Sequence, residues 1–150
     1  MEIILAENHG FCYGVKRAVE MADEAANSEG KSYTLGPIIH NPQVVGRLES
    51  KGVSPIQEVA DIDEGTMIIR SHGVGPAIYA EAEEKGLHIL DATCPHVKKA
   101  QQDAKSVIED GMTLVILGEK NHPEVKSINL WANNKGIIIE DENSAEKLQI

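Results

Sequence analysis

Short apolar runs alternate with amphipathic stretches along this chain, and the alternation predicts a succession of strands and helices. The clearest helical stretch has apolar residues at i, i+3, i+4, i+7 and i+11, which form one helix face: Val15, Ala18, Val19, Ala22 and Ala26. The apolar runs expected to form strands are residues 2–6, 32–35, 53–56, 66–69, 88–90, 113–117 and 136–139. The run 113–117 predicts the clearest strand of all.

Proline, glycine and small polar residues mark where the helices should begin and end. Asn41 followed by Pro42 is typical of an N-cap with proline at the first helical position, and Gly52 provides a left-handed stop. Further helices are expected over residues 76–85, 95–110 and 123–132. Ser144 is expected to cap a last helix that the end of the chain interrupts.

This order of elements predicts an α/β fold with mainly parallel sheets and flanking helices. Aromatic residues make up only 3% of the chain, so the core must be built from Val, Ile, Leu and Ala, as in buried parallel strands. The strand–helix rhythm restarts near residue 95. We therefore expect a complete first α/β lobe over residues 1–95 and part of a second α/β lobe over residues 96–150.

The charge of the chain narrows the possible ligands. A formal net charge of −10 argues against nucleic-acid binding, because no basic stripe is available to neutralise phosphates. An anionic small molecule would need a local pocket of positive potential. The sequence contains no apolar run of membrane-spanning length and no recognisable export signal, so we expect a cytoplasmic protein whose two cysteines are reduced.

Five soft or titratable residues come shortly after predicted strands. They are Cys12, His40, His72, Cys94 and His122. The carboxyl ends of parallel strands meet at one edge of a sheet, where ligands bind and helix N-termini direct their amides toward anions. We therefore expect these side chains to converge on a ligand site at that edge.

The two cysteines each stand at a predicted helix start, where unpaired amides and the helix dipole favour a thiolate. Two such thiolates suit a metal or a cluster: zinc would need histidine as well, and an iron–sulfur cluster would need more thiolates than this chain holds. The simpler interpretation is that each cysteine is a small buried apolar residue and each histidine a solvated one. His9, His88 and His96 keep that simpler interpretation.

The segment "NHPEV", residues 121–125, combines a histidine with a carboxylate at the start of a helix. His122 could hold a phosphate oxygen while Glu124 donates or relays a proton. Alternatively, Glu124 only complements the helix dipole.

Five motifs occur in order and together identify a family resemblance: "GFCYGVKRAV", "GPIIHNPQVV", "RSHGVGP", "DATCPHVKKA" and "GEKNHPEV". They resemble the 4-hydroxy-3-methylbut-2-enyl diphosphate reductases, the LytB or IspH family of the non-mevalonate isoprenoid pathway. The resemblance covers the whole chain.

The resemblance implies a reductive dehydroxylation of that allylic diphosphate to isopentenyl and dimethylallyl diphosphate. It implies a three-lobed α/β fold around a [4Fe–4S] cluster held by three cysteines, with ferredoxin or flavodoxin as electron donor. Carried over by motif, Cys12 and Cys94 would be cluster ligands, and Glu124 would deliver a proton. The residues implied to line the diphosphate pocket are His40, His72 and His122.

The chain departs from the family in length and in cysteine content. Members are considerably longer, and their third cysteine ligand is absent from this chain. We therefore expect an N-terminal portion that alone holds no stable cluster and has no reductase activity, which anaerobic reconstitution with absorbance and EPR would test. Two alternatives stay open: a zinc hydrolase using Cys12, Cys94 and one histidine with Glu124 as base, and a non-enzymatic anion-binding module.

Overall fold

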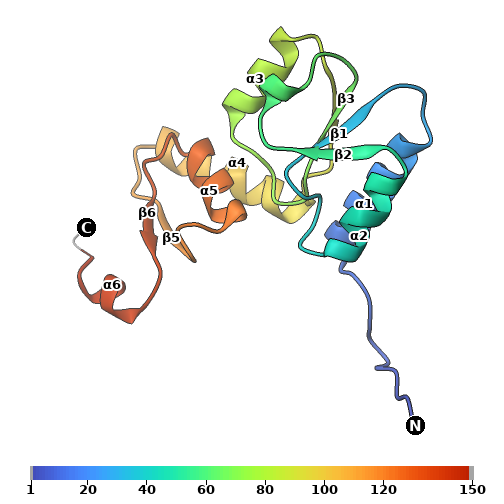
Figure 1. Ribbon diagram of the computed structural model, residues 1–150. Coiled ribbons are helices and arrows are strands. Elements are labelled where there is room, and N and C mark those ends of the chain that lie inside the picture. Colours follow the sequence, from blue (N-terminus) through green and yellow to red (C-terminus); the bar gives the residue numbers. More distant parts are fainter. Residues whose placement is uncertain (1, 149–150) are drawn as a thin grey trace.

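The structure, a computed structural model, describes residues 2–148 and has the α/β architecture that the sequence predicts (Figure 1). Its elements in chain order are α1 (Tyr13–Ala26), β1 (Ser32–Leu35), α2 (Pro42–Ser50), β2 (Val53–Ile56), the 3-10 helix η1 (Val59–Asp61), β3 (Thr66–Ile69), α3 (Pro76–Glu84), β4 (His88–Asp91), α4 (Pro95–Glu109), β5 (Val115–Leu117), α5 (Pro123–Trp131), β6 (Ile137–Ile139) and α6 (Glu142–Glu146).

Four strands form a parallel sheet in the order β2-β1-β3-β4. Ser32 at the start of β1 is in register with Val53 of β2 and Thr66 of β3, and Thr66 is in register with His88 of β4. All four strands therefore end at the same edge, which is the edge that the sequence assigns to the ligand site.

Helices cover both faces of this sheet. Successive side chains of a strand point to opposite faces, so Ile68 of β3 packs toward α1 and α2 while Met67 and Ile69 pack toward η1 and α3. All three side chains are fully buried. Burial on both faces explains why β3 reads as a continuous apolar run instead of an alternating one.

A second, smaller sheet pairs β5 with β6 in parallel, with α5 as the connection between them. Helix α4 leads from the first sheet to the second and packs along α5 (Figure 1). The division at residues 95 and 96 into two lobes agrees with this arrangement and stays a prediction. None of the helices within residues 2–148 is long and apolar enough to cross a membrane.

Most of the predicted helix ends are confirmed. The Asn41 side chain accepts a hydrogen bond from the Val44 N–H at 3.1 Å and so caps α2, with Pro42 at the first helical position. Gly52 follows α2 with a φ of +92°, the left-handed conformation that favours glycine. Helices α2, α3, α4 and α5 each begin at a proline, as predicted: Pro42, Pro76, Pro95 and Pro123.

The strand predicted over residues 2–6 is wrong. Residues 2–12 contain no helix or strand, and the chain here leads away from the body of the molecule (Figure 1). The side chains of Ile3, Ile4 and Leu5 are therefore 73%, 84% and 75% exposed. A strand needs a hydrogen-bonded neighbour, and none of the described strands pairs with this segment. Consequently Cys12 does not follow a strand, contrary to the prediction.

The last helix also differs from the prediction. Its N-cap is Asp141, whose side chain accepts a hydrogen bond from the Ser144 N–H at 2.7 Å. Ser144 is the third helical residue and closes a reciprocal capping box with Asp141. Helix α6 ends at Glu146, so the end of the chain does not interrupt it. The strand predicted over residues 113–117 is shorter than expected, because β5 spans only Val115–Leu117.

Candidate functional site

Three histidines from three different connections meet near the carboxyl edge of the four-stranded sheet. His40 lies between β1 and α2, His72 lies between β3 and α3, and His122 is the N-cap of α5. The ring centroids of His40 and His72 are 4.4 Å apart, and that of His122 is 6.0 Å from His40 and 5.8 Å from His72. We call these three residues the histidine cluster.

Hydrogen bonds between the strand connections fix the position of His40 and His72. The N–H and the hydroxyl of Ser71 both donate to the carbonyl oxygen of Ile38, at 3.3 and 3.2 Å. The carbonyl of Ser71 in turn accepts from the N–H of Cys94 at 2.9 Å. The loops after β1, β3 and β4 are thereby joined side by side, so each histidine lies one or two residues from a fixed point.

A hydrogen bond from the backbone determines which ring nitrogen of His122 carries the proton. The backbone N–H of Glu124 lies 3.2 Å from Nδ1 of His122 and can only donate, so Nδ1 acts as the acceptor. The neutral ring then carries its proton on Nε2. His122 can therefore offer an N–H donor from Nε2 while it caps α5.

His72 is half-buried beside other cationic or titratable groups. Burial is the largest cause that lowers the pKa of His72 to about 4, and the charges of His40, Arg70 and His122 lower it further. At neutral pH the ring is therefore uncharged. Its Nδ1 is buried and has no hydrogen-bond partner among the described residues. An anion placed against this ring would reverse the effect of the neighbouring charges and favour protonation.

A buried polar pair holds the backbone of the site in place. Ser127 Oγ lies 2.8 Å from the carbonyl oxygen of His72 and 3.1 Å from that of Glu124, and its proton can donate to either. The same hydroxyl accepts from Gln101 Nε2 at 3.1 Å. Gln101 and Ser127 are only 1% and 3% exposed. Gly73 has a φ of +71° and lies against Gln101 with no room for a Cβ, so the loop needs glycine there.

Glu124 lies in the first turn of α5, and its side chain is half-buried. Its peptide is held from both directions, because its N–H donates to His122 and its carbonyl oxygen is contacted by Ser127. The residue therefore has a fixed backbone within two positions of the histidine cluster. A carboxylate on such a backbone is suited to hold or release a proton beside a bound anion.

Cys12 and Cys94 are both free thiols and both N-caps, of α1 and α4. Cys12 is exposed and Cys94 is half-buried. The Cys94 sulfur lies directly over Gly14 in the first turn of α1, so a Cβ at residue 14 would collide with it. Gly14, the second glycine of the "GFCYG" motif, thus lets Cys94 lie against α1 at a point only two residues after Cys12.

The described residues do not form a complete set of metal ligands. Within residues 2–148, no group of three or more His, Cys, Asp or Glu side chains is positioned to hold a metal ion. The described residues therefore do not bring together the donor set that a zinc hydrolase would need. They also offer two thiolates, which is fewer than the three that a [4Fe–4S] cluster of the implied type requires.

The three remaining histidines have other positions, as expected. His9 Nδ1 lies 2.8 Å from the carbonyl oxygen of Ala6, within the extended N-terminal segment. His88 begins β4 and its Nδ1 lies 3.4 Å from the hydroxyl of Thr66. His96 is exposed in the first turn of α4.

Sequence reasoning missed the buried polar residues around the histidine cluster. Gln101 and Ser127 are polar residues of predicted helices and belong to none of the five motifs, and Arg70 enters only as the first residue of "RSHGVGP". For Ser127, a usable signal was its spacing from Glu124, because a serine three residues later can bond back to that carbonyl. The burial of Gln101 has no comparable local signal.

Comparisons with known proteins agree with the motif analysis. The family model described as "LytB protein" matches residues 3–150. The 4-hydroxy-3-methylbut-2-enyl diphosphate reductase of Geotalea uraniireducens is 50% identical over 148 residues, covering 99% of this chain and 52% of the relative. The one of Geobacter metallireducens is 51% identical with the same coverage. The chain thus spans about half the length of the curated relatives it matches.

Solved structures give the same result for the fold. A structure of (E)-4-hydroxy-3-methyl-but-2-enyl diphosphate reductase, described as the terminal enzyme of the non-mevalonate pathway, matches with a TM-score of 0.83 and 47% identity over 97% of this chain and 53% of that one. The E-1-hydroxy-2-methyl-but-2-enyl-4-diphosphate reductase of Plasmodium falciparum matches with a TM-score of 0.91 and 32% identity, covering 96% and 46%.

Proposed function

The chain belongs to the LytB protein family, and we propose that it carries the diphosphate-binding and proton-donating part of a 4-hydroxy-3-methylbut-2-enyl diphosphate reductase. The observation that carries the proposal is the convergence of His40, His72 and His122 from three separate connections. The reaction would be the reductive removal of the substrate hydroxyl, giving isopentenyl and dimethylallyl diphosphate.

The histidine cluster binds the diphosphate through N–H donors. Nε2 of His122 donates to a phosphate oxygen while its Nδ1 continues to accept from Glu124. His72 enters as a neutral ring and takes up a proton as the anion arrives, because the diphosphate charge offsets both the burial and the neighbouring charges that lower its pKa. His40, the exposed member, completes the third side of the pocket.

Glu124 supplies the proton that the departing hydroxyl needs. Its backbone is fixed by His122 and Ser127, which keeps the residue at the start of α5 beside the bound diphosphate. Proton donation from a positioned carboxylic acid converts a poor leaving group, hydroxide, into water.

Cys12 and Cys94 would be two of the thiolate ligands of an iron–sulfur cluster. Two thiolates do not complete the implied site, so by this proposal the chain alone holds no cluster and performs no reduction. The electron donor would be a small redox protein, ferredoxin or flavodoxin, and the protein would work in the cytoplasm, where thiols stay reduced.

Isothermal titration calorimetry with pyrophosphate tests the diphosphate site on the chain as it stands. We expect saturable binding, net proton uptake in buffers of different ionisation enthalpy, and affinity weakened about tenfold by His122→Gln, since one charge-assisted hydrogen bond is lost. The matched control is His88→Gln, which changes a histidine on β4 outside the cluster. Equal affinities of wild type and His122→Gln would refute the proposal.

A further inference from the structure

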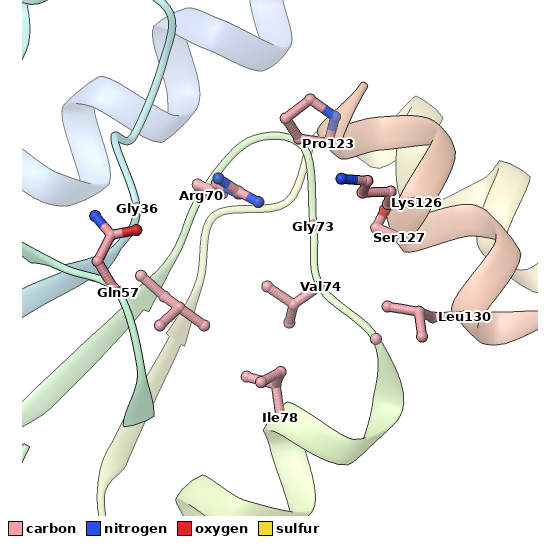
Figure 2. A pocket seen from close by; sticks show the side chains of 12 residues that line it. Gly36, Gln57, Arg70, Gly73, Val74, Ile78, Pro123, Lys126, Ser127 and Leu130 are labelled. Carbon is pink, nitrogen blue, oxygen red and sulfur yellow. The ribbon is translucent and has the colours of Figure 1, made fainter. Parts of the chain in front are cut away.

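A cavity of about 270 Å³ lies between the carboxyl edge of the four-stranded sheet and α5, beside the histidine cluster. Six of its lining residues divide by chemistry into a polar set and an apolar set: Gln57, Arg70 and Lys126, and Val74, Ile78 and Leu130. In Figure 2 Arg70 and Lys126 lie above the three apolar side chains, and Gln57 lies to the left of the cavity. The cavity thus has a polar end and an apolar end.

The cations at the polar end lack partners. Among the described residues, neither Arg70 nor Lys126 forms an ion pair, although the chain carries 24 acidic residues. The Nε of Arg70 is buried and unpaired in this part of the chain, and burial lowers the pKa of the guanidinium. A half-buried cation without a counter-charge is costly, so Arg70 favours an anion at this end of the cavity, and the exposed Lys126 adds a second positive charge.

The apolar end of the cavity indicates that the anion also carries a hydrocarbon part. Val74, Ile78 and Leu130 offer hydrocarbon surface that an inorganic ion would leave uncovered. The volume is at the lower limit for small-molecule pockets, which suits a head group with a short tail. None of the three histidines lines this cavity.

We propose that this cavity is a second ligand site that binds a small amphipathic anion, with a phosphate or carboxylate head and a short hydrocarbon tail. Arg70, Lys126 and Gln57 hold the head by charge and hydrogen bonds, because a guanidinium and an ammonium suit oxyanions. The tail lies against Val74, Ile78 and Leu130. The site does not depend on the proposed reductase function, since none of the three histidines lines it, but the two sites are electrostatic neighbours because the Arg70 charge also lowers the pKa of His72.

The single tryptophan provides a reporter for this cavity. Trp131 Nε1 donates to the carbonyl oxygen of Val74 at 2.9 Å, and Val74 and Leu130 both line the cavity. A ligand that enters should therefore change the intrinsic fluorescence of Trp131. The probes are isopentyl phosphate, inorganic phosphate as the head alone, and isopentyl alcohol as the tail alone.

We expect a saturable fluorescence change with isopentyl phosphate, weaker binding of inorganic phosphate, and the weakest binding of the alcohol. Arg70→Gln should weaken isopentyl phosphate binding about tenfold through the loss of a charge-assisted contact, and Lys126→Gln several-fold. The control for charge is Lys135→Gln, an exposed lysine after α5. Lys135→Gln should leave the affinity unchanged. His40→Gln reports binding at the histidine cluster and should weaken the fluorescence-detected affinity less than Arg70→Gln does.

Three outcomes would overturn the proposal. The first is the absence of a saturable signal with isopentyl phosphate in the wild-type chain. The second is a loss of binding in His40→Gln with none in Arg70→Gln, which would assign the anion to the histidine cluster. The third outcome matters if circular dichroism shows that Arg70→Gln does not fold. In that case equal affinities of Lys126→Gln and Lys135→Gln for isopentyl phosphate would rule out the site. Failure of pyrophosphate binding at the histidine cluster would leave this proposal standing.

Discussion

The two sheets of this molecule arise from the same strand–helix pattern but differ in burial. In the four-stranded region, residues 13–91, both faces of the sheet are covered, and Met67, Ile68 and Ile69 of β3 are fully buried. In the two-stranded region, residues 115–146, Leu117 of β5 is 80% exposed and Ile137 of β6 is 37% exposed. In both regions an apolar run forms a strand, but only in the four-stranded region are all the side chains of such a run buried.

The two regions also differ in the interactions that stabilise them. Two buried apolar clusters fill the four-stranded region, whereas α5 of the two-stranded region, besides the contact of Leu130 with Gly75, is attached to the loop after β3 by two side-chain hydrogen bonds. These are the hydrogen bonds of Ser127 Oγ with the His72 carbonyl and of Trp131 Nε1 with the Val74 carbonyl. His122 and Glu124 thus depend on hydrogen bonds to a better-packed neighbour, while His40 and His72 lie on the packed sheet itself.

The largest difference between the regions should appear when one apolar side chain is truncated in each. Ile68→Ala should lower the free energy of unfolding by about 3 kcal/mol, because it leaves a cavity in a fully buried cluster. Leu117→Ala should change that free energy by less than about 0.5 kcal/mol, since its side chain is mostly in water. Urea unfolding curves measure both, and equal losses would contradict the comparison.

The polar attachment of α5 should be the next most sensitive point. Ser127→Ala leaves Gln101 Nε2 without its buried acceptor and should lower the free energy of unfolding by about 2 kcal/mol. It should also weaken pyrophosphate binding, because the His72 and Glu124 carbonyls lose the contact that sets their spacing. The matched control is Ser106→Ala, an exposed serine on α4. If both variants are as stable as wild type, the buried hydroxyl does not anchor α5.

The sequence was sufficient for the features that local chemistry decides. Pro42 and Pro123 begin helices because proline is accepted at a first helical position, and Gly52 ends one because it adopts a left-handed φ. The meeting of His40 and His72 was also predictable, since β1 and β3 are parallel strands of one sheet and end at one edge. His122 follows β5 of the second sheet, so its approach to them depends on how α5 packs and did not follow from that rule.

The features that depend on distant partners were not predictable in this way. Residues 2–6 have the composition of a strand, but pairing requires a neighbouring strand that no local pattern reveals. The choice of Asp141 over Ser144 as a cap follows from a reciprocal pair in which either residue could serve. Gln101 is buried because α4 packs on α5 and because Gly73 of the loop after β3 lies against it, which a polar helical sequence does not indicate.

The smallest expected effect concerns the contact between the two regions, where the ring of His72 lies near those of His40 and His122. Burial, followed by the charges of His40, Arg70 and His122, lowers the pKa of His72 from 6.5 to about 4 in the folded chain. Between these two values the unfolded chain binds the additional proton, so the stability contributed by neutral His72 is complete above pH 6.5 and is lost as the pH falls toward 4. Since the ring is only half-buried, the loss should be on the order of 1 kcal/mol after solvent screening.

Urea unfolding of wild type and His72→Gln at a series of pH values isolates this contribution, because the carboxylates that titrate in the same range are common to both chains. The stability difference between wild type and variant should shrink by that amount from pH 7 to pH 4. His88→Gln, on the exposed start of β4, should give a curve parallel to wild type in this window. If the curve of His72→Gln is also parallel, His72 is as solvated as an ordinary surface histidine. The contact between the two regions would then be open to water. In that case the hydrogen bonds of Ser127 and Trp131 hold α5 less firmly than their distances indicate.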